Sequence, residues 1–238
     1  MPAVDAVLAA LVMAVGCALQ GAVGFGANLV AAPLLLLIDD RFVPGPTIVA
    51  TGVLNLLVVR REGASRVDPT IGTAIVGQVV GTVGAGVVLA LIADDVLSLL
   101  FAGLVLLAVA LSVAGWQLAK TRSTLAGVGV LSGFMGTVSG IGGPPIALVY
   151  QRSDGPTLRG TLARYFTVGN LVAIPTLIVA GRLGRDELLP ILVVMPGALA
   201  GYAVSGWLAG HLDKRAARPL ILGLSAAAAL AVLVRTLA

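Results

Sequence analysis

The pattern of hydrophobic and polar positions divides the chain into long apolar segments separated by short, charged ones. Two of these segments are interrupted by glycine, and the others are unbroken. Apolar segments of about 20 residues have the length that a helix needs to cross a membrane. The predicted helices cover 4–38 (broken at 24–28), 46–59, 69–92, 96–118, 124–151 (broken at 139–145), 158–180, 187–210 and 216–236. The expected fold class is therefore an all-α polytopic membrane protein.

Both interruptions are rich in glycine, which loosens a helix and frees backbone N–H and C=O groups. The first reads Gly24-Phe25-Gly26-Ala27-Asn28, and the second reads Ser139-Gly140-Ile141-Gly142-Gly143-Pro144-Pro145. Unpaired backbone within a bilayer is tolerated only where it is buried in protein or lines a cavity. Two interruptions at matching places in two halves are the pattern expected of a transport site.

The two halves of the chain can be superposed, with residues 1–120 as a first repeat and residues 121–238 as a second. The matched positions are Gly24 with Gly140, Gly26 with Gly142, Asn55 with Asn170, and Gly77, Gly81 and Gly86 with Gly197, Gly201 and Gly206. A single match would carry no weight in a chain with 31 glycines. The common order of the matches indicates an internal repeat within one membrane domain.

The distribution of lysine and arginine distinguishes two topologies, because cytoplasmic loops are enriched in both residues. If each broken segment crosses once, the repeats are parallel and the basic residues divide six to eight, which shows no bias. If each is a re-entrant hairpin, the repeats are inverted and the division is ten to four, with Arg164 inside the membrane. The ten are Arg60, Arg61, Arg66, Lys120, Arg122, Arg152, Arg159, Lys214, Arg215 and Arg218, and the four are Arg41, Arg182, Arg185 and Arg235. The charges favour two inverted repeats, each a broken re-entrant hairpin plus three transmembrane helices.

The composition agrees with a membrane protein, since 58% of the residues are hydrophobic and 11% are charged, with a mean hydropathy of +1.07. The pI of about 9.8 comes from short basic loops that set orientation in the membrane. We therefore expect the lipid bilayer as a partner and no nucleic acid. The single cysteine, Cys17, excludes an internal disulfide.

The helical segments that follow the breaks begin near residues 27–29 and 144–146. A helix N-terminus carries roughly half a positive charge and several unpaired N–H groups, which favour an anion. In the hairpin topology the two tips enter from opposite sides and meet near the midplane, where they present these groups to a ligand. The alternative interpretation is that the glycines only permit close crossing of helices.

Polar side chains inside the apolar segments are further candidates for contact with a substrate. Asn55 and Asn170 could donate to an oxyanion without a buried charge, or could instead bond a neighbouring helix. Arg164 could attract an anion or extend to the cytoplasmic surface. Polar contacts of second rank are Gln20, Asn28, Gln78, Ser139 and Tyr150. The candidate substrate-binding residues are Gly24, Phe25, Gly26, Ala27, Asn28, Asn55, Ser139, Gly140, Gly142, Gly143, Pro144, Arg164 and Asn170.

Several types of chemistry have no support in the sequence. The middle of each span lacks Asp and Glu, which argues against a carboxylate proton relay, and no phosphate-binding loop is present for ATP. No cluster of His, Cys or carboxylates predicts a metal site, and no nucleophile pairs with a base. We therefore expect no enzyme, no catalytic residue, no cofactor and no metal.

The doubled break resembles the TauE/SafE family of sulfite exporters, also described as sulfonate-uptake permeases. Members of that family carry two breaks of the type G-x-G-G-G, each followed by an apolar run that contains proline. Here the first copy runs from Gly24 to Asn28 with Pro33 beyond it, and the second runs from Gly140 to Pro145. The first copy departs from the family pattern because Ala27 and Asn28 stand where two glycines are usual.

The resemblance implies a multi-pass protein of the bacterial inner (cell) membrane that handles sulfite, sulfonates such as sulfoacetate, or related small anions. We expect a secondary carrier that works by alternating access and binds its anionic substrate at the midplane between the two breaks. The rival hypothesis is a membrane scaffold or assembly protein whose glycines serve packing alone. The sequence leaves open which oxyanion is carried, the direction of transport, a coupled ion and a homodimer.

Overall fold

The computed structural model describes residues 1–63, 67–114, 116–211, 227 and 231. Every regular element among them is a helix: α1 Ala3–Val23, α2 Ala27–Ile38, η1 Asp40–Phe42, α3 Gly45–Glu62, α4 Ile71–Leu91, α5 Asp94–Ala114, α6 Arg122–Ser139, α7 Gly143–Tyr150, α8 Gly155–Val179 and α9 Leu188–His211. Apart from residues 227 and 231, the predicted helix over 216–236 lies outside the described residues, as do Arg66, Lys214, Arg215, Arg218 and Arg235.

Five of the described helical segments are long and apolar enough to cross a membrane, as the predicted fold class requires. They are Ala3–Val23, Asp40–Glu62, Ile71–Leu91, Gly155–Val179 and Leu188–His211. Large apolar side chains are exposed along the outside of these helices, for example Val76, Val80, Val83 and Val87 on α4. An exposed apolar surface of this extent is expected where lipid surrounds the protein.

Two predicted boundaries differ from the structure. The helix predicted over 46–59 continues to Glu62, because Arg61 and Glu62 bind other helices instead of extending into water. The helix predicted over 96–118 is α5, which begins at Asp94 and ends at Ala114.

Both predicted breaks are present, and the chain turns back on itself at each. Gly24 and Gly26 separate α1 from α2, and each has a φ of 109°. Gly140 follows α6 with a φ of 76°. These left-handed values favour glycine because it has no Cβ. As a result α2 packs beside α1 and α7 packs beside α6.

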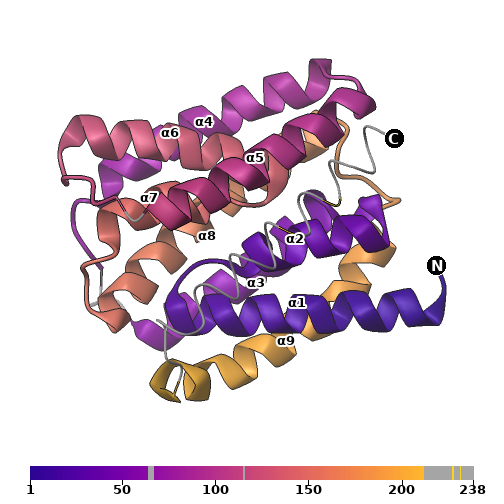
Figure 1. The fold of residues 1–238 in the computed structure, drawn as a ribbon, viewed down its shortest axis with the longest axis horizontal. Helices are drawn as coiled ribbons and strands as arrows, with labels where there is room; N and C mark the ends of the chain where they lie inside the picture. The colour runs from indigo at the N-terminus through magenta and orange to yellow at the C-terminus, as the bar shows by residue number, and fades with distance from the viewer. Residues whose placement is uncertain (64–66, 115, 212–226, 228–230, 232–238) are drawn as a thin grey trace.

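The two hairpins begin at opposite ends of the molecule. In Figure 1, α1 starts at the right-hand edge with the N-terminus, and α6 starts at the left-hand edge. Asp68, shortly before α4, is joined to Lys120, shortly before α6: Lys120 Nζ lies 2.6 Å from Asp68 Oδ2. Burial raises the pKa of Asp68, but hydrogen bonds from Lys120 and Thr70 outweigh it and hold that pKa below its usual range.

Glycine-mediated crossings join each half to the other. The most extensive helix pairs are α1 with α9 and α4 with α6. At six of their glycines an added Cβ would collide with a carbonyl oxygen of the facing helix: Gly77 with Ala126, Gly81 with Val130, Gly129 with Ala74, Gly133 with Gln78, Gly197 with Ala10 and Gly201 with Ala14. Ala126 and Val130 lie 116 residues after Ala10 and Ala14, the same offset that separates Gly24 from Gly140. Helices α1 and α6 therefore make these contacts at positions separated by the same offset, and each packs on a helix from the other half of the sequence.

Helices α3 and α8 connect the two glycine-mediated pairs. They pack against each other, while α3 also contacts α9 and α8 also contacts α4. Gly52 of α3 lies against the side chain of Asn170 in α8, where an added Cβ would be 3.2 Å from the amide nitrogen. Asn55 and Asn170, which the sequence comparison pairs, thus both lie on these connecting helices, close to residues of both breaks.

Candidate functional site

A cavity lies where the two broken segments approach each other. Its volume is about 50 Å³, measured as the space open to the centre of a water-sized sphere. Its polar lining consists of Gln20, Asn28, Thr51, Asn55, Gln78, Thr82, Ser132, Thr137 and Asn170, and its glycine lining of Gly26, Gly133, Gly136, Gly140, Gly142, Gly143 and Gly169. Among the residues that the structure describes, no ionisable side chain lines this cavity, so its described lining offers dipoles to a ligand and no full charge.

The N-terminus of α2 forms one wall of the cavity through Gly26, Asn28 and Leu29. The Ala27 N–H donates to Gln20 Oε1 over 3.0 Å. The N–H groups of Asn28 and Leu29 belong to the first turn, where a helix provides no acceptor for them. Together with the helix dipole, these donors make the α2 end favourable for an anion.

The N-terminus of α7 supplies fewer donors than α2. Gly142, Gly143 and Pro144 line the cavity, but Pro144 and Pro145 have no N–H. The Gly143 N–H is therefore the donor that remains in the first turn of α7. Ser132 donates its hydroxyl to the Gly142 carbonyl and so holds this break against α6. The two tips thus present unequal sets of backbone donors.

A relay of amide groups fixes the orientation of Asn55. Because Gln20 Oε1 accepts from the Ala27 N–H, its Nε2 is directed at Asn55, and it donates to Asn55 Oδ1 over 2.8 Å. The Asn55 oxygen is therefore occupied, and its Nδ2 is the group that a ligand can use. Asn55 is 2% exposed to solvent, so this donor acts in a dry environment where hydrogen bonds are strong.

Two further asparagines tie the breaks to their neighbours. Asn28 Nδ2 donates to the Gly140 carbonyl over 3.0 Å, which joins the tip of the first hairpin to the tip of the second. Asn170 Nδ2 donates to the Ile48 carbonyl over 3.2 Å. Asn55 and Asn170, which the sequence comparison pairs, therefore use opposite ends of their amides for bonds within the protein. Asn55 accepts through Oδ1, which leaves its Nδ2 for a ligand, whereas Asn170 donates through Nδ2, which leaves its Oδ1.

Two amide oxygens at the cavity have no hydrogen-bond donor among the described residues. They are Asn28 Oδ1 and Gln78 Oε1, and both atoms are buried. Leaving a buried acceptor unsatisfied costs about 1–3 kcal/mol. Such a cost is acceptable at a site where a ligand supplies the missing donor.

A family model for the sulfite exporter TauE/SafE matches residues 8–232 of the chain. The chain belongs to the TauE/SafE family. Comparisons with curated proteins and with solved structures found no match. The family predicted from the two glycine-rich breaks is thus confirmed, and it makes the chain a multi-pass membrane transporter.

Eight of the candidate residues from the TauE/SafE motifs and the central helices line the cavity: Gly26, Asn28, Asn55, Gly140, Gly142, Gly143, Pro144 and Asn170. The second-rank candidates Gln20 and Gln78 line it as well. These residues come from both breaks and from α1, α3, α4 and α8. The fold therefore gathers at one point residues that are more than a hundred positions apart in the sequence.

The remaining candidates lie beside the cavity and serve other contacts. Gly24 packs against the backbone of Arg159, and the Phe25 side chain packs against Gly143. Ala27 acts through its N–H on Gln20. Ser139 donates its hydroxyl hydrogen to the Met135 carbonyl, and the Tyr150 hydroxyl forms a hydrogen bond with the Thr70 hydroxyl. Arg164 donates a hydrogen bond to the Gly63 carbonyl at 3.4 Å.

Sequence reasoning missed four hydroxyl residues of the cavity: Thr51, Thr82, Ser132 and Thr137. A signal for them exists in the spacing of small polar residues. Thr82 follows Gln78 by four positions, and Ser132 and Gly136 share the same spacing on α6. Residues four apart lie on one face of a helix, so this spacing marks the faces of α4 and α6 that meet the cavity.

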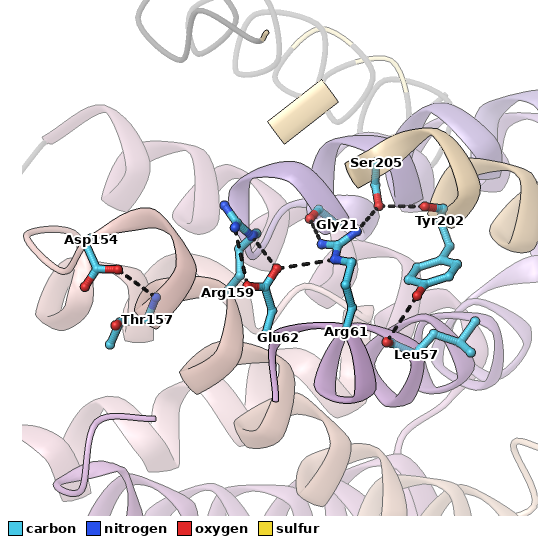
Figure 2. A network of polar contacts seen from close by, with 9 residues as sticks. All are labelled: Gly21, Leu57, Arg61, Glu62, Asp154, Thr157, Arg159, Tyr202 and Ser205. Carbon is cyan, nitrogen blue, oxygen red and sulfur yellow. Dashed lines mark hydrogen bonds and ion pairs between the residues drawn. The ribbon is translucent and has the colours of Figure 1, made fainter. Parts of the chain in front are cut away.

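Outside the cavity, a network of charged groups joins four helices at the end where α3 finishes (Figure 2). Arg159 Nε lies 2.8 Å from Glu62 Oε1, and Arg61 Nε lies 3.3 Å from the same oxygen. Arg61 also donates to the Gly21 carbonyl at 2.6 Å and to Ser205 Oγ at 2.7 Å. This network fixes α3, α8 and α9 around the last turn of α1, next to the first break.

Proposed function

We propose that the protein is a secondary carrier that moves sulfite across the bacterial inner membrane by alternating access. The observation that carries the proposal is the cavity between the two breaks, which is lined by the N-terminal residues of α2 and α7 and by Asn55, whose oxygen is occupied by Gln20. An anion bound there is held by dipoles, because no charged side chain of the described residues lines the site. Binding by dipoles is weaker than binding by a cation, which suits a carrier that must also release its substrate.

The size of the cavity favours the smallest anions that the family suggests. A water molecule needs about 10–15 Å³ in this measure, so a cavity of about 50 Å³ accepts roughly four water-sized groups. Sulfite has four heavy atoms and matches this size. Sulfoacetate is about twice as large and would require the surrounding helices to open further.

The arrangement of the halves supports a rocking mechanism. Equivalent glycines of α4 and α9 pack on equivalent positions of α6 and α1, and the two hairpins begin at opposite ends of the molecule (Figure 1). We infer that the chain is an inverted repeat of two re-entrant hairpins whose tips enclose the anion near the midplane. Rocking of one half against the other would then expose the anion to each side in turn.

The membrane potential favours export without a coupled ion. It contributes about 2.3 kcal/mol per unit charge per 100 mV. At about 1.4 kcal/mol per factor of ten, an inside-negative potential of 100 mV expels a monovalent anion by roughly fifty-fold. The proposed direction is therefore out of the cell.

The proposal is tested by sulfite exchange in proteoliposomes. We expect saturable exchange that falls about tenfold in Asn55→Leu, which removes the donor, and by a similar factor in Gln20→Leu, which removes its orientation. Gln151→Leu is the matched control, because Gln151 bonds the Trp116 carbonyl away from the cavity. Exchange absent from the wild type would favour the scaffold hypothesis, and exchange unaffected in Asn55→Leu would exclude this cavity as the site.

A further inference from the structure

The two unsatisfied oxygens in the cavity specify more about the ligand than its negative charge. Asn28 and Gln78 are each 5% exposed, and both line the cavity. Their oxygens Asn28 Oδ1 and Gln78 Oε1 are acceptors with no donor among the described residues. A bare oxyanion has only acceptors, so it cannot satisfy either of them.

The acceptor on Asn28 cannot be exchanged for a donor by turning the amide. Its Nδ2 donates to the Gly140 carbonyl over 3.0 Å. A reversed amide would place Oδ1 against that carbonyl, and two acceptors would then face each other. The site therefore combines fixed donors, at the α2 N-terminus and Asn55, with a fixed acceptor at Asn28.

The charge of the site matches one negative charge better than two. Each helix N-terminus carries roughly half a positive charge, so α2 and α7 together supply about one. In the described part of the chain, no ionisable side chain lines the cavity to neutralise a second negative charge. The cost of burying an ion grows with the square of its charge, which makes a dianion far less favourable in this environment.

We propose that the species bound and carried is the protonated monoanion, hydrogensulfite, and that the sulfite dianion is rejected. Its O–H donates to Asn28 Oδ1 or Gln78 Oε1, and its remaining oxygens accept from the α2 N–H groups and Asn55 Nδ2. This inference rests on the proposed function and adds the protonation state of the substrate to it. It makes the two amide oxygens the residues that determine specificity.

The first test compares sulfite with methanesulfonate in wild-type proteoliposomes. Methanesulfonate is also a monovalent sulfur oxyanion, but it carries a methyl group and no O–H at neutral pH. The assay measures transport of labelled sulfite in the presence of a competitor. We expect methanesulfonate to compete at least about tenfold more weakly than unlabelled sulfite does. The apparent affinity for total sulfite should weaken about tenfold per pH unit above the pKa of hydrogensulfite, because the protonated fraction falls by that factor.

The second test removes the acceptors. Gln78→Met keeps the shape of the side chain without its amide, and Asn28→Leu does the same at the first break. Both should lower the preference for hydrogensulfite over methanesulfonate towards one, whereas a purely structural defect would weaken both anions alike. Gln151→Met is the control with the same change away from the cavity, and it should keep the wild-type preference.

The outcomes separate this inference from the function on which it rests. Equal competition by methanesulfonate, or affinity that strengthens as sulfite loses its proton, would overturn the inference and leave a sulfite carrier. Stimulation by sodium without any effect of pH would assign the two oxygens to a cation and would equally overturn it. Failure of any anion to show saturable flux would instead refute the proposed function.

Discussion

Replacing Gly81 by leucine is expected to cost at least about 3 kcal/mol of stability and to leave little folded protein. Gly81 lies where α4 crosses α6, and an added Cβ would collide with the Val130 carbonyl. Backbone at a helix crossing cannot move aside without separating the two helices, so α4 and α6 would lose their contact. Thermal unfolding in detergent, followed by size-exclusion chromatography, measures the effect.

The same helix provides the control for this substitution. Gly84 is exposed and has nothing within 4 Å of an added Cβ, so Gly84→Leu should unfold at nearly the wild-type temperature. Gly201→Leu should behave like Gly81→Leu, because its Cβ would meet the Ala14 carbonyl at the equivalent crossing of α9 and α1. Equal stability of Gly81→Leu and Gly84→Leu would show that the crossings do not hold the halves together.

Replacing Glu62 by glutamine is expected to destabilise the protein by about 3 kcal/mol. The Glu62 side chain is 5% exposed and lies between Arg159 and Arg61 (Figure 2). The substitution removes the negative charge and leaves two guanidinium groups close together with less compensation. The unfolding temperature measured at several salt concentrations should show the loss, with little dependence on salt because the pair is shielded from solvent.

A matched substitution and a compensating one identify the cause of that loss. The Glu187 carboxylate accepts a solvent-exposed hydrogen bond from the Gly184 N–H. Glu187→Gln should therefore lower the free energy of unfolding by well under about 1 kcal/mol. Adding Arg159→Met to Glu62→Gln removes one uncompensated charge and should recover part of the stability. If Glu62→Gln proves as stable as the wild type, the network does not fix the end of α1.

The breaks and the helix inventory were predictable because both depend on local composition. Closely grouped glycines within an apolar run favour a break, and Gly24 and Gly140 indeed adopt left-handed backbone. The glycines Gly77 and Gly197 were paired by their positions in the sequence, and both lie at close helix crossings. The helices that face these glycines could not be predicted, because the spacing of residues along one helix does not indicate which other helix packs against it.

The hydrogen bonds of the cavity depend on contacts that the sequence does not reveal. The orientation of Asn55 follows from Gln20, 35 positions earlier, and that of Asn28 follows from Gly140, 112 positions later. Gln78 reaches the cavity because α4 packs on α6, across the two halves. Arg164 was considered for its charge, yet it bonds the Gly63 carbonyl and does not line the cavity.

The measurement that tests the central claim most directly is sulfite efflux from proteoliposomes that contain only the purified protein and an imposed membrane potential. The account predicts saturable efflux that accelerates when the inside is made negative, because each cycle carries one net negative charge outward. Efflux no faster than from protein-free liposomes, at any potential, would contradict the assignment of the cavity to anion transport.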